Sequence, residues 1–286
     1  MNSNLLSLIK KEGLKQQEDG IYLANNLTNN KKQKDERKLR EQVSSVKYDN
    51  YLEAISNNHS IPVMDFEIDL FLKKMPKGAL IMDIGGCWGW HWRRLAEIRP
   101  DVSILIIDFV KSNLSHALNV VEDLVGKQVF LMHADATSLP FSTNIGLFDG
   151  IWTAQTFQHI PDFKRAVNEA YRLLKPKGFF INYSLHITPF NKIIYKILNK
   201  PFHIKGIVQN TFYLTRANND QLRDIENIFT NKVSLRYTEN LFHPDLHFTY
   251  SGKINNILGF LDIFLSKYSL ISKFLGRQAS FEVQKL

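Results

Sequence analysis

Short apolar runs alternate along the middle of the chain with segments whose apolar residues recur at helical spacing. The runs are rich in Ile, Leu and Val and span 79–84, 102–108, 129–134 and 148–152. Runs of this kind are typical of buried strands. Ala166–Leu174 has helical spacing, and a Pro/Gly turn and a further strand from Phe179 follow it. The alternation of strand and helix predicts an α/β fold.

The first run enters a glycine-rich turn, Gly85-Gly86-Cys87-Trp88-Gly89. A strand followed by such a turn and a helix brings backbone N–H groups close to a cofactor. The dinucleotide template G-x-G-x-x-G fails, because its later glycines would fall on Cys87 and Trp90. The P-loop template also fails, because no Gly-Lys-Ser/Thr closes the turn.

Acidic residues end the next two strands. Asp108 lies 23 positions after Gly85 (108 − 85), a spacing at which a carboxylate accepts hydrogen bonds from ribose hydroxyls. A helix N-cap or loop carboxylate is the alternative for this residue. Asp135-Ala136 ends the third strand, and Ser138-Leu139-Pro140-Phe141 follows it. The spacing of Asp108 favours an adenosine-containing cofactor.

Together the glycine turn, Asp108, Asp135 and Lys175-Pro176-Lys177-Gly178 resemble the class I S-adenosylmethionine-dependent methyltransferases, in their small-molecule, type 11-like branch. The resemblance covers residues 79–183. It implies an α/β, Rossmann-like, seven-stranded and mostly parallel sheet with helices on both faces and an antiparallel last strand. S-adenosylmethionine is the implied cofactor, with no metal. The implied cofactor-binding residues are Asp83, Gly85, Gly86, Gly89, Asp108, Phe109, Asp135, Ala136 and Ala154.

Two helical segments accompany this domain. We expect residues 1–78 to form an N-terminal helical extension or lid, with a linker at Asn25–Lys34, and residues 79–286 to form the methyltransferase domain. A helical insertion is predicted at about 241–277, before the last strand. Its apolar residues follow helical spacing for about six turns from Ile254. This segment could contact a membrane, cover an apolar acceptor, pack on the sheet or form a homodimer contact.

Candidate acceptor-side residues come from loops and from the extension. Tyr48 and Tyr51 are candidates for the acceptor pocket, although packing in the core is the alternative. His159, after the fourth strand, is the candidate general base for a hydroxyl acceptor, and His186 is a second acceptor-side candidate. Either histidine could instead be a loop residue bonded to the backbone. Cys87, the single cysteine, stands where the family keeps a glycine and is expected to pack in the turn.

A motif that the chain lacks narrows the range of possible methyl acceptors. Ala154-Gln155-Thr156-Phe157 replaces the Asn/Asp-Pro-Pro-Tyr/Phe motif of enzymes that methylate base amino groups, so DNA is not expected. We expect O-methylation of a small-molecule or lipid- or glycan-linked acceptor. Alternatives are a quinone-type C-methyltransferase, an RNA methyltransferase, and a protein of this fold that has lost the cofactor.

Charge and hydropathy refine this picture. The net charge is +8, and residues 187–286 hold 13 Lys/Arg against 7 Asp/Glu. That basic excess fits an anionic substrate, a membrane surface, nucleic acid or a solvated exterior, and RNA would need it to hold phosphates. The chain has no long apolar run and no signal-peptide pattern, so a cytoplasmic location is expected, with peripheral membrane contact as the alternative.

Overall fold

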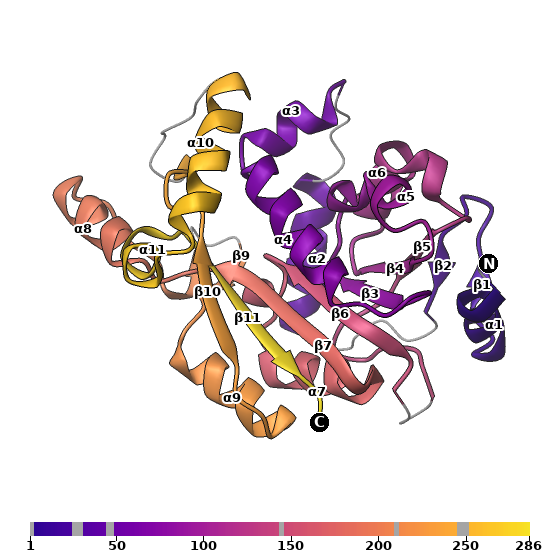
Figure 1. Ribbon diagram of the computed structural model, residues 1–286. Coiled ribbons are helices and arrows are strands. Elements are labelled where there is room, and N and C mark those ends of the chain that lie inside the picture. The colour runs from indigo at the N-terminus through magenta and orange to yellow at the C-terminus, as the bar shows by residue number, and fades with distance from the viewer. Residues whose placement is uncertain (1–2, 25–30, 44–48, 143–145, 209–211, 245–251) are drawn as a thin grey trace.

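A nine-stranded sheet forms the centre of the computed structural model, in the order β1-β2-β5-β4-β3-β6-β7-β11-β10 (Figure 1). The structure describes residues 3–24, 31–43, 49–142, 146–208, 212–244 and 252–286. The sheet strands are β1 (Lys15–Gln16), β2 (Tyr22–Leu23), β3 (Leu80–Ile84), β4 (Ser103–Asp108), β5 (Val129–His133), β6 (Phe148–Ala154), β7 (Leu174–Leu185), β10 (Ser234–Thr238) and β11 (Gln278–Gln284).

The seven strands from β5 to β10 are the predicted sheet. β3 pairs in parallel with β4 and β6, and the parallel ladder continues to β5 on one side and β7 on the other. The last strand, β11, runs antiparallel to both β7 and β10. The prediction of a mostly parallel sheet with an antiparallel last strand is therefore confirmed, and the two short strands β1 and β2 extend it.

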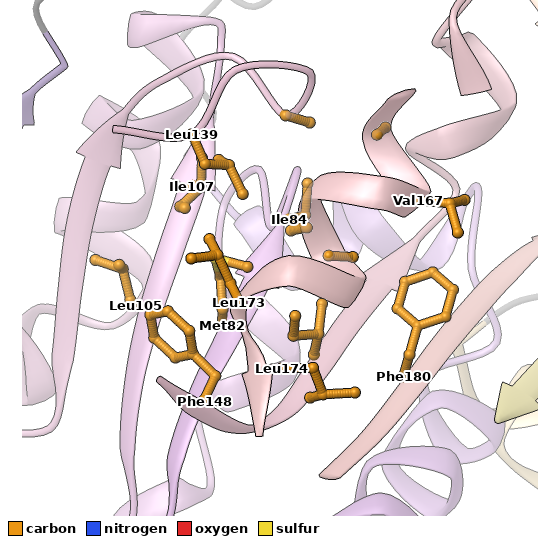
Figure 2. Packing of buried hydrophobic residues seen from close by; sticks show 14 of the residues in the cluster. Met82, Ile84, Leu105, Ile107, Leu139, Phe148, Val167, Leu173, Leu174 and Phe180 are labelled. Carbon is orange, nitrogen blue, oxygen red and sulfur yellow. The ribbon is translucent and has the colours of Figure 1, made fainter. Parts of the chain in front are cut away.

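Both faces of the sheet are buried. Along β3, Ile81 points to one apolar cluster while Met82 and Ile84 point to the other, because successive side chains of a strand alternate between faces. Leu105 and Ile107 of β4 join Met82 and Ile84, as Figure 2 shows. This explains why the strands read as continuous apolar runs rather than as an alternation of polar and apolar residues.

Helices cover the two faces. α1, α7 and α9 pack on the face of Met82, and α4, α5 and α6 pack on the face of Ile81. Their buried side chains recur at helical spacing, as in α7, where Ala166, Val167 and Ala170 are buried. The helices flanking the sheet are α1 (Ser3–Lys11), α4 (Ile61–Lys73), α5 (Leu95–Ile98), α6 (Lys111–Val120), α7 (Phe163–Leu173) and α9 (Asn219–Phe229).

The N-terminal segment is more closely joined to the sheet than the sequence predicted. β2 pairs in parallel with β5, and β1 pairs antiparallel with β2, so residues 15–23 extend the edge of the sheet. Leu5 and Ile9 of α1 are fully buried in the adjoining core. Two further helices, α2 (Lys31–Val43) and α3 (Tyr51–Ser56), follow. α2 begins within the predicted linker, most of which lies outside the described residues.

The C-terminal region carries the remaining elements. α8 (Pro189–Ile197) and the hairpin of β8 (Lys205–Val208) and β9 (Phe212–Thr215) follow β7. Asn218 caps α9 by accepting hydrogen bonds from two backbone N–H groups. The predicted six-turn helix is two helices, α10 (Gly252–Leu265) and α11 (Ser269–Leu275). None of the helices in the described ranges combines the length and apolar character needed to cross a bilayer.

Candidate functional site

A cavity of about 540 Å³ opens at the carboxyl ends of β3, β4, β5 and β6. Ligands bind at this edge of open α/β sheets, next to the point where the strand order reverses. Here the order reverses at β3: the chain proceeds from β3 through β4 to β5, and then returns to β6 on the other side of β3. α3 and α4 close the other side of the cavity, through residues such as Ile55 and Met64. A cavity of this size is in the range of small-molecule sites.

The glycine turn forms the floor of the cavity and takes a conformation that favours glycine. Gly85, Cys87 and Gly89 have φ values of 72°, 50° and 64°. Cys87, which stands at a family glycine, keeps the left-handed backbone that glycine adopts without strain. A Cβ on Gly86 would lie 2.2 Å from Asp83 Oδ2, so only glycine lets the backbone pass this carboxylate. Gly85 and Gly86 line the cavity and have no side chain, so the backbone of the turn is accessible there.

Asp83 lies beneath the turn and not in the wall of the cavity. It is fully buried, and its Oδ2 accepts hydrogen bonds from His91 Nε2 and Trp92 Nε1, both at 2.7 Å. Both donors belong to the short helix η1 (Trp90–Trp92) that follows the turn. The predicted cofactor residue Asp83 therefore fixes the shape of the turn, and His91 itself lines the cavity.

Asp108 ends β4 at the cavity wall. Its Oδ1 accepts the Val110 N–H at 2.8 Å and its Oδ2 accepts the Cys87 N–H at 3.1 Å, which ties the strand end to the glycine turn. Burial raises the pKa of Asp108 to about 6, although the hydrogen bonds from Val110, Asn113 and Cys87 oppose the increase. The carboxylate remains available to accept further hydrogen bonds from a ligand in the cavity.

Other predicted cofactor residues lie around the same cavity. Phe109, Ala136 and Ala154 line it, and so does Asp135. Asp135 Oδ1 accepts hydrogen bonds from the backbone N–H and the hydroxyl of Thr137, which fixes the loop after β5. Residues at or near the ends of four strands therefore line one cavity.

Besides Asp83, three predicted residues are not among those that line the cavity. Gly89 faces the core, where an added Cβ would meet Ile106 at 2.7 Å. The Tyr51 hydroxyl bonds His116 Nδ1 at 3.0 Å, and its ring packs edge-on against Trp88. His186 packs on Tyr237, and its Nδ1 donates to the Gly276 carbonyl. Tyr48 lies outside the described residues.

His159 lines the cavity, but both its ring nitrogens are hydrogen bonded. Nδ1 donates to the Tyr213 carbonyl at 2.7 Å, and Nε2 accepts from the Gln158 amide nitrogen at 3.1 Å. The Leu185 N–H fixes the amide orientation by donating to Gln158 Oε1. Burial, with a smaller contribution from Arg40, lowers the pKa of His159 to about 3. These contacts disfavour proton uptake at Nε2, and a role as general base stays a prediction.

The cavity wall also contains residues that no sequence pattern indicated. His59 and Arg277 line it, and the ring of His59 packs 5.6 Å from that of Trp90. Among the described residues, no hydrogen-bond partner contacts the buried His59 Nδ1. Burial lowers the pKa of His59 to about 3, and the nearby charge of Arg277 lowers it further. His59 and Arg277 are 218 positions apart (277 − 59), so no local pattern could have joined them.

The strand order and the cavity at the switch point define an α/β domain of the class that binds nucleotide-like cofactors. Residues 82–182 match the sequence profile of the family described as a methyltransferase domain. This match agrees with the resemblance to methyltransferases that the motifs carry.

Individual similarities are partial. The demethylmenaquinone methyltransferase of Thermus thermophilus is 34% identical over 111 residues, covering 39% of this chain and 48% of that enzyme. The chain thus spans about half the length of the curated relatives it matches. Among solved structures, the [4+2]-cyclase SpnF has a TM-score of 0.52 and 18% identity, covering 77% of this chain and 80% of that one.

A further solved structure bears on the fold alone. Geranyl diphosphate C-methyltransferase from Streptomyces coelicolor, in complex with Mg²⁺, geranyl diphosphate and S-adenosyl-L-homocysteine, has a TM-score of 0.52. Its sequence identity is 8%, and the match covers 77% of this chain and 79% of that one. Because a cyclase and a methyltransferase match the fold equally well, function must be argued from the residues of the site.

Proposed function

We propose that the chain is an S-adenosylmethionine-dependent methyltransferase that acts on a small-molecule acceptor. The proposal rests on one observation: Gly85, Gly86, Asp108 and Asp135 line the same cavity. Gly85 follows β3, Asp108 ends β4 and Asp135 lies two residues after β5, so three parallel strands contribute to it. The match of residues 82–182 to the methyltransferase domain family supports it.

The residues of the cavity fit S-adenosylmethionine. The Asp108 carboxylate would accept hydrogen bonds from the ribose hydroxyls, and the exposed backbone at Gly85 and Gly86 would approach the methionine part. Phe109, Ala136 and the Asp135 loop would surround the adenine. The charge, size and apolar surfaces of the wall suit each part of this cofactor.

The main task of the protein in this reaction is to position the acceptor relative to the cofactor. The cofactor supplies a methyl group on a sulfonium, which is a good leaving group. The protein must hold an acceptor nucleophile in line with that methyl group and exclude water. The acceptor would lie beside His59, Trp90 and Arg277, which line the cavity. The uncharged His59 imidazole could accept a hydrogen bond from an acceptor hydroxyl there.

Two acceptor atoms fit this arrangement. O-methylation of a hydroxyl is the function that the sequence predicted, and His59 offers a hydrogen-bond acceptor for it. The relatives described as demethylmenaquinone methyltransferases favour a second candidate, transfer to a ring carbon of a quinone-type acceptor. The aromatic surface of Trp90 at the cavity wall suits a flat ring of this kind.

A product assay tests the proposal. The protein is incubated with methyl-labelled S-adenosylmethionine and separate pools of phenols, sugars and reduced quinones, and S-adenosylhomocysteine and labelled product are measured. We expect product in at least one pool and loss of turnover in Asp108→Asn. Base treatment and fragmentation then distinguish an O-methyl from a C-methyl product. Binding of the cofactor without turnover in any pool would argue against a small-molecule acceptor.

A further inference from the structure

Helices α8, α10 and α11 carry large apolar side chains that are exposed. Phe260 on α10 is 68% exposed, and Leu270 on α11 is 83% exposed. Exposed apolar groups that gather on neighbouring elements mark an interaction surface. We call the exposed residues of these three helices the apolar face. Its members include two from each helix: Ile193, Ile197, Ile257, Phe260, Leu270 and Phe274.

The three helices adjoin one another although α8 is distant from the other two in sequence. The Thr188 hydroxyl, at the start of α8, donates to the Phe274 carbonyl of α11 at 2.7 Å. The Ser272 hydroxyl of α11 donates to the Leu265 carbonyl at the end of α10 at 3.1 Å. In Figure 1 these helices lie together at the upper left, away from β1 and β2. The apolar face is therefore one region of the molecule.

The exposed charge on α8, α10 and α11 themselves has one sign. Residues 187–208 contain four lysines and no acidic residue, and residues 252–275 contain three lysines and one acid, Asp262. That aspartate is 1% exposed and accepts hydrogen bonds from the Asn240 side chain and the Leu241 N–H. Within the described parts of α8, α10 and α11, no carboxylate is exposed.

A cleft next to the apolar face gathers part of this charge. It has a volume of about 530 Å³, and Lys192, Lys196 and Lys200 line it with Tyr195 and Phe202. The three lysines recur every four residues from α8 onward, so they follow one side of the helix and its end. A cleft with this lining suits an anionic headgroup beside an apolar chain.

We propose that the apolar face docks on the surface of an anionic lipid membrane. Exposed apolar side chains enter the boundary between headgroups and acyl chains, while flanking lysines attract anionic lipids. A second copy of the chain fits less well, because a two-fold contact places the same patch against itself and would bring lysine to lysine. RNA would use the lysines but leave Leu270 and Phe260 without a role.

The apolar face adjoins the cavity. Gly259 of α10 packs against Pro62 of α4, where an added Cβ would lie 2.8 Å from the proline ring. Arg277, two residues after α11, lines the cavity. Docking would therefore bring an acceptor dissolved in the bilayer close to the cavity. This last step rests on the proposed function, whereas docking itself does not.

Flotation with lipid vesicles tests the proposal without cofactor or acceptor. Vesicles contain phosphatidylcholine alone or mixed with phosphatidylglycerol. We expect the wild-type chain to float with the mixed vesicles and F260S/L270S to bind at least about tenfold more weakly, because two apolar side chains no longer enter the lipid. K192Q/K196Q/K200Q should reduce binding to mixed vesicles on the order of a hundredfold.

Matched controls separate docking from general effects. L235S changes an exposed apolar residue on β10, and K77Q/K127Q/K164Q removes the same charge from exposed sites elsewhere. Both should float as the wild type does, and thermal unfolding should show that every variant is folded.

Three outcomes would overturn the assignment. The first is no binding of the wild type to mixed vesicles, and the second is binding that ignores the substitutions in the apolar face or its lysines. The third is a dimer that F260S/L270S dissociates, in a protein that does not bind vesicles, which would assign the face to a second copy. Loss of flotation would leave the methyltransferase proposal intact, because cofactor binding is measured separately.

Discussion

Replacement of Asp108 by asparagine should weaken cofactor binding, because it removes the carboxylate charge and the oxygen that accepts the Cys87 N–H. Asparagine keeps an oxygen that can accept the Val110 N–H, which Asp108 now accepts at 2.8 Å. It removes the negative charge and one acceptor. A hydrogen bond to a charged group contributes about 1.5 to 3 kcal/mol, against about 0.5 to 1.5 kcal/mol for a neutral one. For the two ribose hydroxyls the loss is about 2 to 3 kcal/mol, roughly a 30- to 150-fold increase in Kd.

The pH dependence gives the same prediction a second readout. Because burial raises the pKa of Asp108 to about 6, most molecules carry a neutral Asp108 at pH about 5. Wild-type affinity should therefore fall about tenfold between pH 7 and pH 5 relative to Asp108→Asn, which has no charge to lose. The comparison with the variant removes the ligand's own titration.

Isothermal titration calorimetry with S-adenosylhomocysteine measures both effects. Asp123→Asn, which changes an exposed carboxylate on the helix after α6, is the control and should bind as the wild type does. Equal affinity of Asp108→Asn and wild type at pH 7 would refute the role of Asp108 in the cofactor site.

Three further predictions concern other residues. Burial raises the pKa of Glu67 to about 7 despite its ion pair with Arg236, so the folded state favours the neutral acid and loses stability as pH rises from about 4.5 through 7. Glu67→Gln should raise the free energy of unfolding by about 1 to 3 kcal/mol in urea at pH 8 and leave it unchanged at pH 4; a stabilisation equal at both pH values would contradict this. Burial raises the pKa of the Cys87 thiol well above its usual range, so iodoacetamide should label it in the unfolded chain and hardly at all in the native protein, as mass spectrometry would show. If the acceptor is a hydroxyl, His59→Gln should lower kcat by about 10²-fold. His159→Gln should lower kcat much less, because both ring nitrogens of His159 are already hydrogen bonded, to Gln158 and Tyr213. A larger loss of kcat in His159→Gln than in His59→Gln would indicate that His159 is the base.

Much of the central fold was predictable because its signals are local. β3, β4, β5 and β6 are apolar runs, and each is followed or ended by residues that break the strand, such as Asp108. The cofactor wall follows from the fold, since the carboxyl ends of parallel strands meet at one edge of the sheet. The family resemblance supplied the strand order, which periodicity alone does not contain.

The parts that were not predicted depend on distant contacts or on very short elements. β1 and β2 have two residues each, too few to show an alternation of polar and apolar positions. The break between α10 and α11 lies in a segment whose apolar spacing continues on both sides, and the Ser272 hydroxyl bond to Leu265 that bridges it is a tertiary detail. His59 and Arg277 meet only because α4 and α11 pack near the same cavity.

Titration of the wild-type chain with S-adenosylhomocysteine tests the central claim most directly. We expect S-adenosylhomocysteine to bind at one site per chain with a Kd on the order of micromolar, whatever the acceptor is. Absence of binding by the folded wild-type protein would contradict the assignment of this cavity to S-adenosylmethionine, and with it the proposal that the chain transfers methyl groups.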